Sequence, residues 1–175
     1  MKAFFVFSGQ GAQAPGMGKD LYESSPRAKA IFDEADAVLG YKLSDICFNG
    51  PAETLTETRY CQVAIYTMSC AALEAFREKY DVEAVSCAGL SLGEYGALYA
   101  AGAFSFADGL KLLNKRAEIA AVHSLHAVSA YISRKIFQHP ASDDTVVRKH
   151  YQWYDDGKHS DPTPGRASRQ VTICR

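Results

Sequence analysis

Residues 88–95 carry a Gly-x-Ser-x-Gly pattern, Ala88-Gly89-Leu90-Ser91-Leu92-Gly93-Glu94-Tyr95, at the junction of two unlike segments. Residues 83–88 are small and apolar, as in a buried strand, whereas residues 94–101 are rich in Ala, Leu and Tyr and predict a helix. A serine at such a sharp turn has a strained backbone and an exposed hydroxyl, and the flanking glycines remove Cβ atoms that would collide. The pattern therefore predicts a nucleophile elbow with Ser91 as the nucleophile.

A second glycine-containing turn follows an apolar, aromatic run at residues 3–7, which is typical of a strand. The turn reads Ser8-Gly9-Gln10-Gly11-Ala12-Gln13, and its glycines allow the main chain to approach a ligand or another loop closely. Gln10 offers a backbone N–H and a side-chain amide. The turn is not a dinucleotide fingerprint, because the third glycine is missing, and it is not a phosphate loop, because no Gly-Lys-Ser/Thr follows.

Together these segments resemble the malonyl-CoA:acyl carrier protein transacylases, the acyltransferases that load malonyl groups for fatty acid and polyketide synthesis. The likeness is carried by residues 5–13, by residues 89–95 and by Lys115-Arg116-Ala117, in the order and spacing of the family. Two positions depart from the family pattern. Ser8 stands where the family usually has proline, and Leu90 stands where it usually has histidine.

The resemblance implies acyl transfer through a covalent intermediate, with malonyl-CoA and acyl carrier protein as partners and no cofactor or metal. Ser91 would attack the thioester of malonyl-CoA and pass the malonyl group to the pantetheine thiol of acyl carrier protein. The backbone N–H groups of Gln10 and Leu92 would stabilise the oxyanion. Arg116 would bind the malonyl carboxylate, which selects a dicarboxylic acyl group over acetyl.

The general base is the part of this mechanism that the sequence does not supply. In the family a histidine lies far downstream, near a Phe-His-Ser sequence, and that sequence does not occur here. The chain has five histidines, all after position 122: His123, His126, His139, His150 and His159. None has neighbours that match the family motif, so we expect this chain to be impaired.

Composition changes abruptly at the same point of the chain. No Glu occurs after Glu118 and no Leu after Leu125, whereas Trp153 is the one tryptophan. The later segment also shows no lasting helical or strand period. We therefore expect residues 1–121 to be the N-terminal part of an acyltransferase core, and residues 122–175 to be an atypical, poorly ordered tail. A frameshift would produce such a break, and a lineage-specific extension is the alternative.

Length and composition limit the remaining function classes. A chain of 175 residues allows one domain, or one domain and a tail, and its net charge of −1 argues against nucleic-acid binding. The five cysteines lack Cys-x-x-Cys spacing, so neither zinc nor a redox pair is indicated, and we expect buried free thiols. The sequence predicts no signal peptide, no membrane span and a cytoplasmic location.

The predicted elements alternate between strand and helix, which indicates an α/β fold with a parallel sheet. Ser25 and Pro26 mark the start of a helix that ends at Gly40, and Thr58 is a candidate cap for a helix over residues 59–79. Ser105 and Asp108 resemble a capping box. The resemblance implies a hydrolase-like acyltransferase core, here incomplete and lacking the family's ferredoxin-like subdomain.

Two other function classes stay open at this stage. A serine hydrolase of the esterase or lipase type also uses a Gly-x-Ser-x-Gly elbow. That class would explain Ser91, but it would leave the Gly9-Gln10-Gly11 turn and Arg116 without a role. A non-catalytic remnant of a frameshifted gene is the third class.

Overall fold

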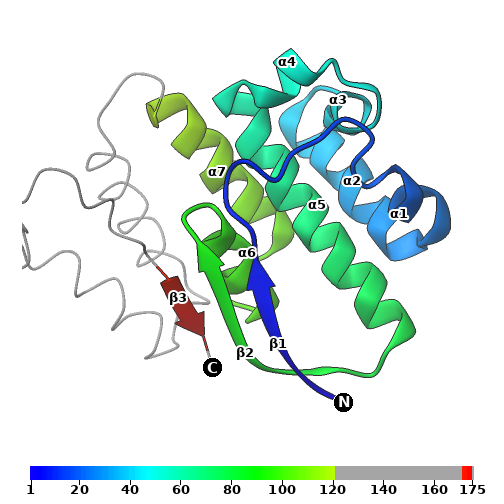
Figure 1. The fold of residues 1–175 in the computed structure, drawn as a ribbon, viewed down its shortest axis with the longest axis vertical. Coiled ribbons are helices and arrows are strands. Elements are labelled where there is room, and N and C mark those ends of the chain that lie inside the picture. The colour runs from blue at the N-terminus through cyan, green and yellow to red at the C-terminus, as the bar shows by residue number, and fades with distance from the viewer. Residues whose placement is uncertain (121–170, 175) are drawn as a thin grey trace, which may run out of the picture.

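The computed structural model describes residues 1–120 and 171–174 as helices covering a small sheet (Figure 1). The elements, in chain order, are β1 (Lys2–Phe7), α1 (Lys19–Ser24), α2 (Pro26–Leu39), α3 (Leu43–Asn49), α4 (Ala52–Thr56), α5 (Thr58–Lys79), β2 (Glu83–Leu90), α6 (Gly93–Ala100), α7 (Phe106–Ala120) and β3 (Val171–Cys174). The predicted α/β class is confirmed.

The sheet has the strand order β1-β2-β3. β1 and β2 run parallel, as predicted, with Phe7 opposite Gly89, so both strands end at the same edge of the sheet. β3 pairs antiparallel to β2, with Val171 opposite Leu90. The two loops that follow β1 and β2 therefore emerge side by side, and in open α/β sheets ligands bind at this carboxyl edge.

The core lies between the sheet and the helices. α6 contacts both β1 and β2, and α5 lies against α2, α6 and α7. The largest fully buried side chains come from these helices and from the α3–α4 region: Tyr66, Phe32, Leu43, Leu55, Leu92, Leu98, Leu110 and Leu113. The long α5 is the central helix of this packing, and it joins the elbow helix α6 to α7.

The hydrogen bonds at the helix ends test the predicted limits of α2, α5 and α7. The Oγ of Ser25 accepts a hydrogen bond from the N–H of Ala28, and Gly40 ends α2 in the left-handed conformation. Ser105 Oγ accepts from the N–H of Asp108 and donates to its carboxylate, which confirms the start of α7. The prediction for Thr58 was wrong. The carbonyl of Glu57 already accepts from the N–H of Cys61, so the hydrogen-bond ladder begins one residue earlier.

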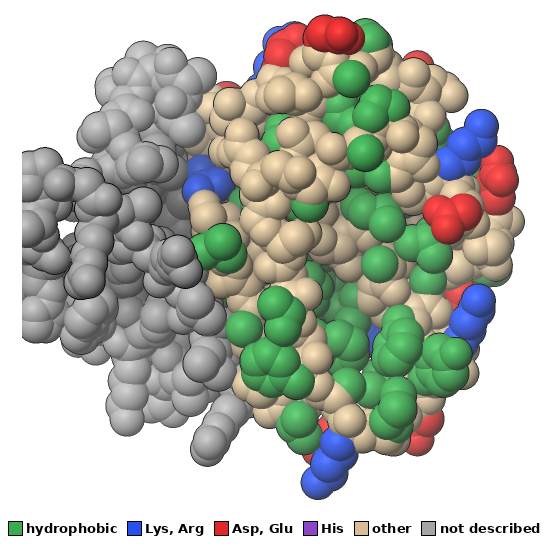
Figure 2. Space-filling view, in the orientation of Figure 1, with side chains coloured by type: hydrophobic (Ala, Val, Ile, Leu, Met, Phe, Trp, Pro, Cys, Tyr) green, Lys and Arg blue, Asp and Glu red, His purple; other side chains and the backbone are tan. Residues whose placement is uncertain are grey.

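The face of the sheet turned away from the helices is apolar and exposed. Phe4 and Val6 on β1 are 55% and 72% exposed, and Val85 on β2 is 43% exposed. Figure 2 shows hydrophobic side chains gathered in its lower half, over the two strands. The opposite face carries Phe7, which is buried.

Four cysteines in the described residues are buried free thiols, as predicted: Cys47, Cys61, Cys70 and Cys87. Burial raises the pKa of the Cys47 thiol to about 12. No helix within residues 1–120 is both long enough and apolar enough to cross a bilayer.

Candidate active site

The elbow forms where β2 meets α6. β2 ends at Leu90, α6 begins at Gly93, and Ser91 between them has a φ of 55°. It is the only residue other than glycine with positive φ in the described part of the chain. A serine in this conformation is strained, because its Cβ crowds the backbone. The prediction of a strained, exposed serine at the turn is confirmed.

The glycines on either side of Ser91 allow the close packing of the turn. A Cβ on Gly89 would overlap the backbone of Gly93, and a Cβ on Gly93 would overlap the carbonyl oxygens of Phe7 and Ser8. The start of α6 therefore lies directly against the end of β1. No other residue type fits at either position without a backbone shift.

The loop after β1 lies beside the elbow. A Cβ on Gly9 would lie 2.9 Å from the carbonyl oxygen of Leu90, so the two loops touch through their main chains. The N–H of Gly11, at a φ of 107°, donates to Gln13 Oε1 at 2.9 Å. Gln10 is the exposed residue between these two anchored glycines. The backbone of Gln10 is thereby held in the loop adjoining Ser91.

Arg116 reaches the elbow from α7. Its Nη2 donates a hydrogen bond to Ser91 Oγ at 2.9 Å, and its Nη1 donates to Gln62 Oε1 on α5 at 2.8 Å. Two residues singled out from the sequence, Ser91 and Arg116, are thus brought into direct contact by different elements. The contact leaves a guanidinium charge within hydrogen-bond distance of the candidate nucleophile.

Gln62 is the site residue that the sequence analysis missed. Gln62 is a polar residue, yet it is only 4% exposed and is as buried as its apolar neighbours Cys61 and Val63. A buried amide needs a partner, and Arg116 provides one. The signal in the sequence was a single polar residue inside a helical stretch that is otherwise apolar, Cys61-Gln62-Val63-Ala64-Ile65.

The start of α5 also supports the loop after β1. Burial raises the pKa of the Cys61 thiol, and a hydrogen bond to the backbone of Gly11 acts in the opposite direction. The Gly9–Gly11 segment therefore packs closely against Leu90 of β2 at one end and is bonded to Cys61 of α5 at the other. Contact at both ends limits the movement of the intervening peptide groups.

Residues 1–120 contain no histidine, so the histidine base that the resemblance implies is not among them. The five histidines, His123, His126, His139, His150 and His159, lie outside the described residues.

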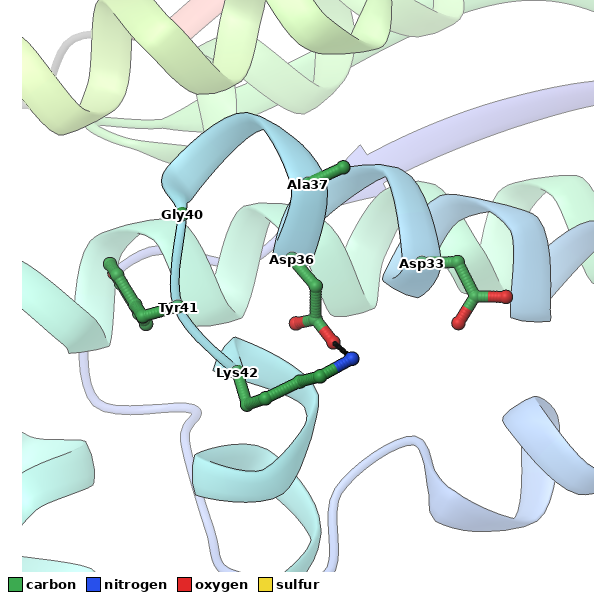
Figure 3. Close-up of a pocket in the computed structure, with 6 residues that line it drawn as sticks. All are labelled: Asp33, Asp36, Ala37, Gly40, Tyr41 and Lys42. Atoms are coloured by element: carbon green, nitrogen blue, oxygen red, sulfur yellow. Dashed lines mark ion pairs between the residues drawn. The ribbon is translucent and has the colours of Figure 1, made fainter.

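A separate pocket opens on α2 and the turn after it, lined by Asp33, Asp36, Ala37, Gly40, Tyr41 and Lys42 (Figure 3). The carboxylate of Asp36 accepts from both the N–H and the hydroxyl of Ser44, at 2.9 and 2.6 Å. Lys42 Nζ lies 3.3 Å from the same carboxylate. These contacts fix the start of α3, so the pocket is part of a structural junction.

Comparison with known proteins decides the family. The family model for the acyl transferase domain matches residues 4–147. This chain belongs to the acyl transferase domain family. The match runs beyond the predicted boundary at residues 121 and 122, and both that boundary and the atypical tail remain predictions.

Among curated relatives, this acyl transferase chain is similar to the malonyl CoA-acyl carrier protein transacylase of Bacillus subtilis strain 168. The two are 52% identical over 117 residues, which cover 67% of this chain and 37% of the relative. The chain thus spans well under half the length of that relative.

Two solved structures share the fold. One is an acyl-carrier-protein S-malonyltransferase from Bartonella henselae, 42% identical, with a TM-score of 0.64 over 69% of this chain and 39% of that one. The other is a malonyl-transacylase in complex with its type II polyketide synthase acyl carrier protein. It is 37% identical, with a TM-score of 0.65 over 70% of this chain and 40% of that one.

Proposed function

We propose that this acyl transferase chain moves a malonyl group from malonyl-CoA to the pantetheine thiol of acyl carrier protein, in fatty acid or polyketide biosynthesis. The observation that carries the proposal is the 2.9 Å hydrogen bond between Arg116 and Ser91. A cation beside an elbow serine suits an acyl group that ends in a carboxylate, and a neutral ester has no use for it. The malonyl-transferring relatives support the same substrate class.

The proposed reaction has two acyl-transfer steps through Ser91. In the first, Ser91 Oγ attacks the thioester carbonyl, the C–S bond breaks, and the serine proton leaves with the CoA thiol. In the second, the pantetheine thiol attacks the serine ester, the bond between the acyl carbon and Ser91 Oγ breaks, and the thiol proton passes to Ser91 Oγ. Each tetrahedral intermediate carries an oxyanion, for which we propose the N–H groups of Gln10 and Leu92 as donors. Each such donor lowers the barrier by about 3 kcal/mol.

Selectivity is assigned to Arg116. Its planar guanidinium can form two parallel hydrogen bonds with a carboxylate, and its hydrogen bond to Gln62 limits the directions in which it can point. The acyl carrier protein is proposed as the acceptor because one solved relative is a malonyl-transacylase bound to its carrier protein. We propose a cytoplasmic site of action, where malonyl-CoA and carrier protein would meet this chain.

Acylation by malonyl-CoA tests the proposal. Intact-mass spectrometry of the full chain should show one malonyl adduct on the wild type and none on Ser91→Ala. The same adduct on Ser91→Ala would overturn the assignment of Ser91. Cleavage of neutral p-nitrophenyl esters without any malonyl adduct would favour a hydrolase. A folded wild type that forms neither product would be a non-catalytic remnant.

A further inference from the structure

The Tyr95 hydroxyl is a buried polar group beside the elbow for which the proposed reaction has no role. Tyr95 lies on α6, one helical turn after Ser91, and its side chain is 3% exposed. Its ring packs near Phe104, with centroids 6.4 Å apart. Within the described residues, its oxygen has no hydrogen-bond partner.

An unpartnered buried hydroxyl destabilises a fold, and phenylalanine would fill the same space without that loss. Native structures satisfy nearly all of their buried polar groups, so an exception needs an explanation. One explanation is a second state of the site in which the hydroxyl acquires a partner. The neighbours of Tyr95 indicate which group that partner is.

Two charged residues act on the hydroxyl. Burial raises the pKa of Tyr95, the positive charge of Arg116 opposes that rise, and the negative charge of Glu94 adds to it. Arg116 is the group whose position is expected to change during catalysis. One of its N–H groups is bound to Gln62 and another to Ser91, and a guanidinium has five.

Acylation changes what Arg116 can bind. Once Ser91 carries a malonyl group, two N–H groups turn to the carboxylate, and the contact with the free serine hydroxyl is lost. With one N–H on Gln62 and two on the carboxylate, the guanidinium has further N–H groups available. Tyr95 can accept one of them, because a phenol oxygen is an acceptor as well as a donor.

We propose that Tyr95 is a positioning residue for Arg116: its hydroxyl accepts a hydrogen bond from the guanidinium while Arg116 holds a carboxylate. This inference rests on the proposed function, because it takes the carboxylate to be that of the acyl group. It gives the acyl transferase a second residue for selecting dicarboxylic substrates, which acts only through Arg116.

The test is Tyr95→Phe in the full chain, with malonate as the equilibrium probe and malonyl-CoA or acetyl-CoA as the acyl donor in single-turnover assays. Loss of a hydrogen bond to a charged group should weaken malonate binding roughly 10-fold. Malonyl transfer to Ser91 should slow by a similar factor, whereas acetyl transfer should not change. In an Arg116→Ala background, Tyr95→Phe should have no further effect on either probe.

Tyr99→Phe is the matched control. Tyr99 lies on the same helix, and its hydroxyl bonds Glu74 at 3.1 Å. The Tyr99→Phe variant should bind malonate as tightly as the wild type. The inference is overturned if Tyr95→Phe only raises the melting temperature, if Tyr99→Phe weakens malonate binding equally, or if the wild type does not bind malonate. Malonate binding that depends on Tyr95, in a wild type that malonyl-CoA does not acylate, would support this inference while the proposed function fails.

Discussion

Gln62 on α5 and Arg116 on α7 are joined by a 2.8 Å hydrogen bond, and the same guanidinium is bonded to Ser91. The central helix thereby limits where the charge beside the elbow can point. A side chain as long as arginine loses considerable rotamer entropy when it is fixed. Because the hydrogen bond to Gln62 already restricts Arg116, less rotamer entropy is lost when a substrate binds.

Gln62→Ala should therefore impair malonyl transfer without removing any group from the reaction. Loss of one hydrogen bond to a charged group costs about 1.5–3 kcal/mol. We expect roughly 10-fold slower malonyl transfer to Ser91 in single-turnover assays. Gln62→Met keeps the approximate length and volume of the side chain but not its acceptor oxygen, so it should lose about as much activity as Gln62→Ala. Wild-type activity in Gln62→Met would mean that Gln62 acts through packing.

Arg116→Ala should alter the choice between acyl groups. In the proposed reaction the malonyl carboxylate would lose its charged partner, which we expect to cost about 2–4 kcal/mol in malonyl transfer. The acetyl group has no carboxylate, so acetyl transfer should slow much less in this variant. Competition between malonyl-CoA and acetyl-CoA, read as the two adduct masses on Ser91, measures the ratio directly. A parallel loss of both adducts would assign Arg116 a structural role.

Gly93→Ala should disrupt the fold at the elbow. The added methyl group would overlap the carbonyl oxygens of Phe7 and Ser8, which are backbone atoms and cannot rotate away. We expect a loss of about 3 kcal/mol or more in the free energy of unfolding. Gly102→Ala is the control, because its φ of 76° is unfavourable but nothing lies within 4 Å of the new Cβ. Gly102→Ala should lower the free energy of unfolding by about 1 kcal/mol. Denaturant titrations of both variants compare the two effects.

Polar substitution should destabilise one face of β1 much more than the other. Val6 is 72% exposed and Phe7 is 7% exposed, although they are adjacent. Val6→Thr should change stability by no more than about 0.5 kcal/mol and should raise solubility. Phe7→Ser should cost about 3–5 kcal/mol, as large core truncations do. Solubility limits and urea midpoints should be measured for both variants. A large loss of stability in Val6→Thr would mean that the face of the sheet that carries Val6 is covered.

Local patterns predicted the parts of this fold that depend on neighbours in sequence. Ser25 with Pro26, Gly40 and the pair Ser105–Asp108 specify helix ends through bonds within a few residues, and all three were predicted correctly. The strained turn at Ser91 was predictable for the same reason, since the Gly-x-Ser-x-Gly pattern contains the glycines that permit it. Thr58 failed because the preceding Glu57 carbonyl had already begun the helix.

Contacts between segments that are distant in the sequence were harder to predict. The bond from Gln62 to Arg116 spans two helices, and a buried glutamine looks like any other polar helix residue until its partner is known. The approach of Gly9 to Leu90 depends on the pairing of β1 with β2. That the Tyr95 hydroxyl has no partner among residues 1–120 can be seen only from the folded arrangement of its neighbours.

The last prediction concerns turnover by the chain as written. Residues 1–120 hold the elbow and the guanidinium but no histidine, so a histidine base for Ser91 would have to come from beyond them. When a triad enzyme loses one member, the oxyanion hole and substrate binding still accelerate the reaction about 10³–10⁴-fold over water. We therefore expect slow acylation of Ser91 and slow transfer to carrier protein, far below the 1–10³ per second of ordinary enzymes.

The control for slow turnover replaces all five histidines with glutamine in one variant of the full chain. If none supplies the base, the variant should acylate Ser91 at the wild-type rate, and that rate should rise smoothly with pH as hydroxide takes the proton. A wild type that turns over at ordinary enzyme rates and falls sharply in this variant would identify one of His123 to His159 as the base. Single His→Gln variants would then locate that base, and the tail would be a working part of the active site.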